Sequence, residues 1–367
     1  MASAPARVVI TGGCGFLGQM LARSLLRRGT LCTHTATGVE GSAPIGELVL
    51  ADVASPPRLL FEELEQRAEI AIGDVSDAEF CRSLVGRGDG PLSVFHLGAV
   101  MSGQGEADFD LCVNVNLHGT LHMLEAARRC GAPRPRFVMT SAGATLGSGA
   151  PTDWVTQDDA VSDATRATPH TTYGMTKACA ELLLADYSRR GFVDGRGCRL
   201  PSVVCRAGAP NAATTGVYSA VVRETLAGVD TSSPIGPGVG HAVVGHRPAV
   251  DALLTMHEAS ATAVDATLGF DRTVFVPSIA VTLAQLDAAV RAAVPPHAAS
   301  LLGRVTYDVD ERLSAAVGSF PTRVTCERAK AIGMWGDELT AADLVRHYAE
   351  DFPDALAEGV TLLGTDS

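Results

Sequence analysis

The chain has 367 residues, 46% of them hydrophobic and 19% charged, so it is long enough to bury a sizeable core and lacks the composition of a disordered protein. Its 41 acidic residues outnumber its 29 basic residues and give a net charge of −12, which argues against a nucleic-acid partner and against an anionic membrane surface. No apolar run approaches the ~18 residues that a membrane-spanning helix needs.

Short β-branched runs alternate with amphipathic stretches in the first two hundred residues, which is the pattern of βαβ units around a parallel sheet. We expect strands at residues 7–10, 47–53, 69–72, 93–97, 136–141 and 197–206. We expect helices at residues 19–28, about 108–129 and 172–190. The segment 30–46 is polar and turn-rich, and we predict a loop inserted between the first helix and the second strand.

The pattern loosens after residue 206. Glycine, proline, serine and threonine cluster in residues 207–245, where we expect loops and short helices that cover the sheet. A further strand is predicted at 273–276, with helices at 283–294 and 341–350. The predicted fold is α/β, a Rossmann-like doubly wound parallel sheet in residues 1–206, with a small substrate-binding lobe in residues 207–367 that returns some segments to the sheet.

A glycine-rich turn follows the first predicted strand and opens the first predicted helix. Residues 11–18 read TGGCGFLG, which has the glycine spacing of a dinucleotide-binding turn. The first glycine allows the tight bend, the second lets the backbone approach the pyrophosphate, and the third lets helix and strand pack closely. The helix N-terminus adds unpaired N–H groups and a partial positive charge. The predicted cofactor contacts here are Gly12, Gly15, Phe16, Leu17 and Gly18.

An acid at the end of the second strand selects NAD in such folds, because it bonds the adenosine ribose and disfavours a 2′-phosphate. The usual distance from the turn falls in segment 30–46, where Glu40 is the only acid nearby. Asp52 ends the run LVLAD and fits if that segment is an insertion, so we expect Asp52 at the ribose, the alternative being a surface acid or turn cap. Asp74, followed by Val75, ends the third strand and is expected at the adenine, or as a turn residue. The predicted cofactor is NAD.

Tyr173 and Lys177 are four residues apart on a predicted helix, which places them on one face. The reference pKa of a tyrosine is about 10. A nearby ammonium and the positive nicotinamide ring would favour the phenolate and so create a general base. Ser141 ends the fifth predicted strand about 30 residues earlier, and together with the glycine turn this makes the YxxxK pattern specific.

These features resemble the extended short-chain dehydrogenase/reductase family, of the NAD-dependent epimerase/dehydratase type, over nearly the whole chain. The resemblance includes HLGA at 96–99 and NLHGT at 116–120. It implies that Leu97 and Asn116 lie along the cofactor and that Pro201 lies beside the nicotinamide. We expect Tyr173 to remove the hydroxyl proton and Lys177 to lower the pKa of Tyr173 and to hold the nicotinamide ribose, so both residues are also expected to contact the cofactor.

The chain departs from the family pattern where the fifth strand ends. The family usually has a serine or threonine at the position of Ala142, in the sequence Thr140-Ser141-Ala142, and this hydroxyl orients the reacting group. Ser141 or Thr145 could replace it, or neither does and the enzyme is slow or altered. Residues 141–150 contain no acid, which argues against a dehydratase of this family.

Longer segments, at 102–120, 187–211 and 221–228, are similar to one subgroup of the family, the D-erythronate dehydrogenases. This similarity implies NAD-linked oxidation of the 2-hydroxyl group of a small sugar acid to a 2-oxo acid. Such an acid needs cations or hydrogen-bond donors. The expected substrate contacts are Ser102, Thr145, Asn211 and Arg223, with Arg206, His241 and His246 as further candidates.

Two other functions stay open. A nucleotide-sugar 4-epimerase would share the cofactor motifs but would keep its NAD bound, and a non-catalytic NAD(H)-sensing regulator would use the same fold. The family also implies a homodimer that pairs the helices at 108–129 and 172–190. The nine cysteines form no CxxC pair, so we expect reduced thiols and no metal site. Strand-like residues begin near position 7, so we expect no signal peptide and a cytoplasmic location.

Overall fold

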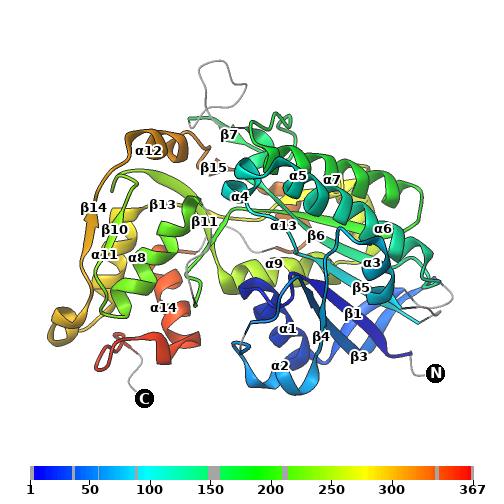
Figure 1. The fold of residues 1–367 in the computed structure, drawn as a ribbon, viewed down its shortest axis with the longest axis horizontal. Coiled ribbons are helices and arrows are strands. Elements are labelled where there is room, and N and C mark those ends of the chain that lie inside the picture. Colours follow the sequence, from blue (N-terminus) through cyan, green and yellow to red (C-terminus); the bar gives the residue numbers. More distant parts are fainter. Residues whose placement is uncertain are drawn as a thin grey trace.

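The computed structural model describes residues 4–34, 38–56, 58–86, 90–147, 158–208, 214–334 and 339–364. Within these ranges, a large sheet with helices on both faces lies beside a smaller lobe (Figure 1). No helix in the described part of the chain is both long and apolar enough to cross a membrane.

The large sheet has the strand order β12-β8-β6-β5-β1-β3, and β3 also pairs with β2 and β4. All neighbouring pairs are parallel except β2 with β3. The strands are β1 (Ala6–Thr11), β2 (Thr30–His34), β3 (Glu40–Asp52), β4 (Glu69–Ile72), β5 (Leu92–His96), β6 (Arg136–Ala142), β8 (Asp194–Leu200) and β12 (Thr273–Phe275). The chain runs outward from β1 to β4 and then returns to β5 on the other side of β1, so the predicted doubly wound sheet is confirmed.

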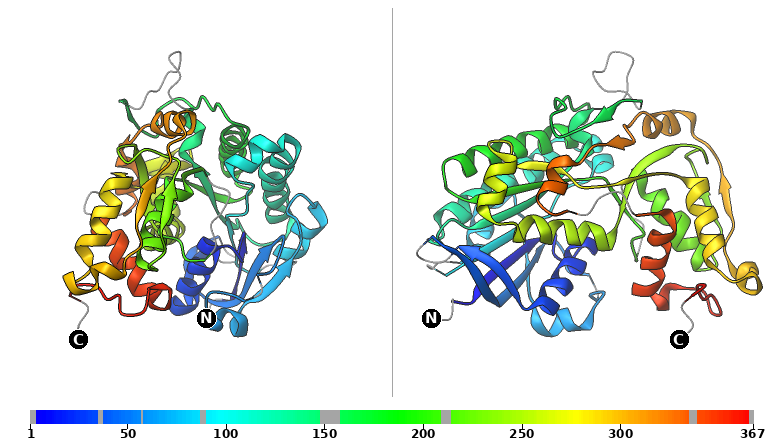
Figure 2. Two further views of the ribbon diagram at one scale, coloured as in Figure 1. Left: turned by 60° about the vertical axis from the view of Figure 1, so that its left-hand side comes forward. Right: turned by 180° about the vertical axis from the view of Figure 1, so that it is seen from behind.

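Each face of the sheet has its own buried core. The helices α3 (Ala78–Val85), α6 (Gly119–Arg129) and α7 (Thr172–Arg189) cover one face, where Val9, Leu124 and Leu184 are buried. The helices α1 (Phe16–Arg28) and α9 (His246–Glu258) cover the other face of the sheet (Figure 2). Leu21, Leu25 and Leu253 are buried there. Burial of such side chains, at about 1.5–3 kcal/mol each, holds the layers together.

The lobe has a third core, which includes Tyr218, Leu286 and Tyr348. Its elements are β9 (Ser202–Val204), α8 (Val217–Leu226), β10 (Thr231–Ser233), β11 (Gly240–Gly245), β13 (Ile279–Thr282), α11 (Leu283–Ala293), β14 (Val305–Tyr307), α12 (Glu311–Gly318) and α14 (Ala341–Asp351). The segments that return to the large sheet are α9, α10 (Ala261–Leu268), β12 and α13 (Glu327–Ala331). The strand β15 (Arg323–Val324) pairs with β7 (Ala160–Val161) in a separate two-stranded sheet. The remaining short helices include α2 (Glu62–Arg67), α4 (Ser102–Ala107) and the 3₁₀ turn Gly143–Leu146.

The prediction of a loop at 30–46 is wrong. This segment forms β2 and the first part of β3, which pair antiparallel from Thr30 with Pro44 to His34 with Glu40, while residues 35–37 lie outside the described ranges. Leu31, Thr33 and Ala43 are buried, so the segment alternates as a strand does. The threonines of this segment are polar, but threonine favours β-strands, so a polar composition does not by itself indicate a loop here.

Charged side chains attach this hairpin to the rest of the sheet. His34 Nε2 lies 3.1 Å from Asp194 Oδ2, and Glu40 accepts a hydrogen bond from Arg136. Arg136 and Arg196 also donate to the His257 carbonyl near the end of α9, at 2.8 and 2.9 Å. The hairpin is therefore anchored by a buried ionic network rather than by apolar contacts alone.

Two other predicted elements are interrupted. The strand expected at 197–206 is divided into β8 and β9 at Pro201, which has no N–H group to donate to a ladder. The helix expected at 108–129 runs through α5 (Phe109–Cys112), a π-helical turn (Val113–His118) and α6. Such π-turns often occur at functional sites.

Candidate active site

The glycine turn lies where the strand order reverses, between the ends of β1 and β5. Gly12 has φ +67°, and a Cβ atom there would lie 2.8 Å from the Gly98 nitrogen. A Cβ atom on Gly18 would collide with the Gly12 carbonyl. Gly15 precedes α1 and gives it no side-chain cap, and the first turn of α1 has no acid. The turn is therefore closely packed, and the first turn of α1 beside it leaves backbone N–H groups without intrahelical partners, which suits a pyrophosphate.

Asp52 reaches the glycine turn. Its carboxylate accepts hydrogen bonds from the backbone nitrogens of Cys14, at 3.1 Å, and Val53, at 2.8 Å. Burial raises its pKa above the usual value, against the effect of these donors. Glu40, the alternative acid, instead pairs with Arg136 in the hairpin. Asp74 follows β4, the neighbour of β3, and its carboxylate accepts from the Ser76 nitrogen at 2.8 Å.

A hydrogen-bond chain connects the glycine turn with the helix that carries Asn116. Thr11 Oγ1 lies 2.8 Å from His96 Nδ1, and His96 Nε2 lies 3.0 Å from Thr120 Oγ1. Thr120 donates its hydroxyl proton to the Asn116 carbonyl at 2.6 Å, so His96 must carry its proton on Nε2. Burial lowers the pKa of His96 to about 3, which keeps the ring neutral.

Replacing His96 with phenylalanine is expected to lower the free energy of unfolding by about 2–4 kcal/mol, because the Thr11 and Thr120 hydroxyls then lose a buried partner. Urea denaturation measures this loss. The matched control is His118→Phe, since His118 lies on the exposed side of the same helical segment. Equal stability of the two variants would contradict the stabilising role of the His96 hydrogen bonds to Thr11 and Thr120.

One face of α7 carries Tyr173, Lys177 and Glu181, each four residues after the last. The helix begins where Thr171 accepts a hydrogen bond from the Gly174 nitrogen, at 3.0 Å. Lys177 Nζ donates to the Thr140 carbonyl at 2.9 Å, near the end of β6. The same ammonium lies 5.8 Å from the centre of the Tyr173 ring. The predicted proximity of the pair to each other and to the end of β6 is therefore present.

The pKa values of Tyr173 and Lys177 in the protein alone are set mainly by burial. Burial raises the pKa of Tyr173 to about 12, and the Cys112 thiol adds to this rise. Burial lowers the pKa of Lys177 to about 8. In the protein alone, desolvation of the phenol outweighs the attraction of an ammonium that points toward Thr140. The combined effect of Lys177 and the nicotinamide ring on the pKa of Tyr173 stays a prediction.

The hydroxyl groups predicted to replace the missing one at Ala142 are both committed elsewhere. Ser141 is buried and donates to Glu181 Oε1 at 2.5 Å, and Glu181 also forms a bidentate ion pair with Arg199. Thr145 is fully buried and donates to the Ala142 carbonyl at 3.0 Å. These contacts do not favour Ser141 or Thr145 as the hydroxyl group that orients the substrate.

Asn116 and Arg223 also have partners within the protein. The Asn116 amide is buried and exchanges hydrogen bonds with the Val100 backbone, at 2.7 and 3.0 Å, so it supports the loop after β5 from behind. Arg223 is buried, pairs with Glu224 and donates to the Arg206 carbonyl at 3.2 Å. These contacts do not favour Arg223 as the group that binds a substrate carboxylate.

The other predicted residues lie near the same end of the sheet. The Leu97 nitrogen donates to the Thr11 carbonyl, and Val75 packs on Gly119 of α6. The half-buried predicted residues are Phe16 and Leu17 at the start of α1, Ser102 at the start of α4, and Pro201 between β8 and β9. Asn211 lies outside the described residues.

A polar cluster that the sequence does not predict lies next to Pro201. Ser202 Oγ lies 2.9 Å from Thr215 Oγ1 and 2.8 Å from His241 Nε2. Burial lowers the pKa of His241 to about 4, so the ring is neutral and cannot act as a cation toward a substrate carboxylate. No spacing signal connects three residues from three separate segments, so only the fold could assemble them.

One group of potential metal ligands occurs among the described residues. Ligand atoms of His34, Glu40 and Asp194 lie within 4.8 Å of one another. Arg136 and Arg196 already pair with these carboxylates, so a cation there would face two buried guanidinium groups. We therefore assign this group to the hairpin anchor and not to a metal.

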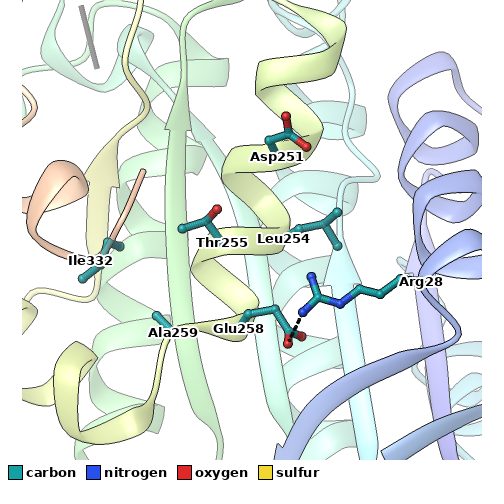
Figure 3. A pocket seen from close by; sticks show the side chains of 7 residues that line it. All are labelled: Arg28, Asp251, Leu254, Thr255, Glu258, Ala259 and Ile332. Carbon is teal, nitrogen blue, oxygen red and sulfur yellow. Dashed lines mark hydrogen bonds and ion pairs between the residues drawn. The ribbon is translucent and has the colours of Figure 1, made fainter. Parts of the chain in front are cut away.

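A hollow of about 390 Å³ lies away from these residues, between α1, α9 and Ile332. Figure 3 shows Arg28 of α1 reaching across it to Glu258 of α9, at 2.7 Å. Its lining residues are Arg28, Asp251, Leu254, Thr255, Glu258, Ala259 and Ile332, none of which belongs to the predicted site.

Comparisons with known proteins agree with this geometry. The sequence model of the NAD dependent epimerase/dehydratase family matches residues 8–244. A D-erythronate dehydrogenase from Cupriavidus necator is 40% identical over 345 residues, 94% of this chain and 98% of that protein. A D-erythronate dehydrogenase from Haemophilus influenzae is 30% identical over 333 residues, 89% of this chain and 94% of that protein. The crystal structure of a nucleoside-diphosphate-sugar epimerase from Agrobacterium tumefaciens has a TM-score of 0.78 and 29% identity, covering 96% of this chain and 95% of that one.

Proposed function

The chain belongs to the NAD dependent epimerase/dehydratase family, and from this we propose that it is an NAD-dependent dehydrogenase that oxidises the 2-hydroxyl group of a small sugar acid, such as D-erythronate, to a 2-oxo acid. The observation that carries the proposal is the position of Tyr173 and Lys177, beside the end of β6 and on the first turns of α7. The two D-erythronate dehydrogenases similar to this chain support the substrate class.

Each part of the site has a role in this reaction. The glycine turn would hold the pyrophosphate and Asp52 the adenosine ribose, and NAD, when bound, accepts a hydride from C2 of the acid. Tyr173 takes the proton of the 2-hydroxyl group, so that the alcohol loses a hydride and a proton and becomes a ketone. Lys177, fixed by Thr140, supplies positive charge beside the Tyr173 ring. We further propose that residues 1–206 hold the cofactor and that residues 207–367 mainly hold the substrate, with Ser102 and Asn211 near its hydroxyl groups.

The direct test is a panel of four- and five-carbon sugar acids with NAD, monitored at the absorbance band of the reduced nicotinamide. Oxidation of 2-hydroxy acids of one stereochemistry is expected. An inactive protein across the whole panel would contradict the proposal.

Epimerisation of a nucleotide sugar is the second candidate, because the similar protein from Agrobacterium tumefaciens is a nucleoside-diphosphate-sugar epimerase. An epimerase would retain NAD through purification and would interconvert nucleotide sugars with no net reduction of added NAD. The presence of Tyr173 and Lys177 on one helix face favours either enzyme over a regulator that only senses NAD(H).

Asp52 is expected to make the enzyme prefer NAD. Loss of a charged hydrogen bond of about 1.5–3 kcal/mol corresponds to about a tenfold to hundredfold change, so Asp52→Asn should reduce kcat/KM for NAD by that factor and raise the relative use of NADP. Steady-state rates with both cofactors measure this. Glu69→Gln, an exposed change at the start of the adjacent strand β4, is the control. Wild type that uses NADP as well as NAD would contradict the role.

We also propose a homodimer through α5 and α7. Phe109 on α5 and Leu182 on α7 are large apolar side chains that are 58% and 69% exposed. A second copy of the chain would cover them. Light scattering after size-exclusion chromatography should give twice the 38.0 kDa chain mass, and Leu182→Glu should give the single mass.

A further inference from the structure

The proposed site lacks a hydroxyl group for the reacting oxygen. Ala142 has none, Ser141 is bound to Glu181, and Thr145 is fully buried against the Ala142 carbonyl. A dehydrogenase of this kind needs a donor that holds the substrate oxygen beside the base while its charge changes. A hydroxyl group from another residue at the same end of the sheet would fill this role.

Ser202 lies at this end. In the parallel pair of β6 and β8, Ala142 is the partner of Leu200, so Ser202 follows only two residues after the partner of the deficient position. The first turn of α7 lies beside the segment that follows Ala142, because a Cβ atom on Gly174, next to Tyr173, would meet the Ala144 carbonyl.

The neighbours of Ser202 leave its proton available. Its Oγ lies between Thr215 Oγ1, at 2.9 Å, and His241 Nε2, at 2.8 Å, and the side chain is half-buried. A serine hydroxyl has one proton and two lone pairs. If His241 and Thr215 both donate to Ser202, the Ser202 proton is directed to a third group.

The surroundings of His241 favour that direction. The ring is 7% exposed and is held between Tyr218 and Phe320, with ring centres 5.3 and 5.9 Å away. Its Nδ1 atom is buried without a hydrogen-bond partner among the described residues. An orphaned buried N–H group is rarer than an under-satisfied acceptor, so the single proton of the neutral ring belongs on Nε2, facing Ser202.

We propose that Ser202 is a substrate-binding residue that donates its hydroxyl proton to the reacting oxygen of the bound 2-hydroxy acid, in place of the hydroxyl group missing at Ala142, and that His241 is a positioning residue that fixes this direction. The inference rests on the proposed dehydrogenase function. Ser202 forms no covalent bond and keeps its proton, while Tyr173 removes the proton of the substrate.

The test compares wild type with Ser202→Ala, Ala142→Ser and the double variant. Ser202→Ala is expected to lower kcat/KM for the sugar acid by about 100-fold, the loss typical of one such donor. Ala142→Ser should change the wild-type rate little, because the role is already filled, but should recover at least about tenfold in the double variant. The dissociation constant of NADH, from its fluorescence, and the thermal unfolding midpoint should stay near wild type in all of them. Ser233→Ala, which removes a buried hydroxyl elsewhere in the lobe, is the control.

A comparison of two His241 variants tests the positioning role of this residue. Glutamine can place an amide N–H near the position of Nε2, whereas leucine cannot, so His241→Gln should keep more kcat than His241→Leu. A Ser202→Ala variant as active as wild type, or a double variant without recovery, would overturn the inference and leave the proposed function intact. A wild type inactive on every sugar acid would instead overturn the proposed function, and this inference with it.

Discussion

Replacing Tyr173 with phenylalanine is expected to lower kcat for sugar-acid oxidation by about 10³-fold, within the range that a general base contributes. Phenylalanine keeps the ring beside Lys177 and removes only the oxygen that accepts the substrate proton. The dissociation constant of NADH should therefore change by less than about twofold, a difference too small to reflect a lost interaction. Stopped-flow or steady-state absorbance of the reduced nicotinamide measures the rate.

The pH profile provides a second signature of this residue. Because burial raises the pKa of Tyr173 to about 12, its base form is scarce at neutral pH, and the wild-type rate should rise with pH. The rise should flatten near pH 8, where Lys177, whose pKa burial lowers to about 8, begins to lose its charge. The control is Tyr187→Phe, which removes a hydroxyl from the other end of α7 that donates to Glu125. Equal rates for wild type and Tyr173→Phe would contradict the base assignment.

The Asp194→Asn variant is expected to lower the free energy of unfolding by about 3–5 kcal/mol, the loss typical of breaking a buried ion pair. Asp194 is fully buried and pairs with Arg136, Arg196 and Arg272, at 3.2, 2.7 and 3.3 Å. Asparagine has nearly the same shape but leaves these guanidinium groups without their central negative charge. Urea denaturation at neutral pH measures the loss.

The difference between wild type and Asp194→Asn should depend on pH. The histidine and arginines around Asp194 hold the pKa of its carboxyl far below the usual value, against the effect of burial. A depressed native pKa adds stability above the unfolded-state pKa of about 3.9, and this stability is lost as the pH falls below it. The control is Asp186→Asn on the exposed surface of α7, which should change the free energy of unfolding far less, because solvent screens its ion pairs with Arg189 and Arg190. A cost as small for Asp194→Asn would contradict the anchoring role of the network.

Local sequence was a good guide wherever neighbouring residues decide the structure. The glycine turn follows from steric limits within a few residues, since Gly12 needs its positive φ and Gly18 has no room for a Cβ atom. The approach of Lys177 to Tyr173 follows from helical spacing on α7. The position of Asp52 at the turn follows from its place at the end of a strand parallel to β1.

The failed expectations concern partners that are distant in sequence. Segment 30–46 was predicted to be a loop because its polar residues indicate no core, but His34 and Glu40 pair with charges more than 90 residues away.

The sequence by itself determined the fold class, the dinucleotide turn and the Tyr173–Lys177 pair, because each depends on periodicity or on steric limits within one or two adjacent elements. Only the tertiary structure decided which hydroxyl groups are available. Ser141 and Ser202 have the same chemistry, and what separates them is that one meets Glu181 across a buried face while the other meets His241 at the edge of the lobe. A side chain's hydrogen-bond partners depend on where distant segments pack, and no local pattern contains that information.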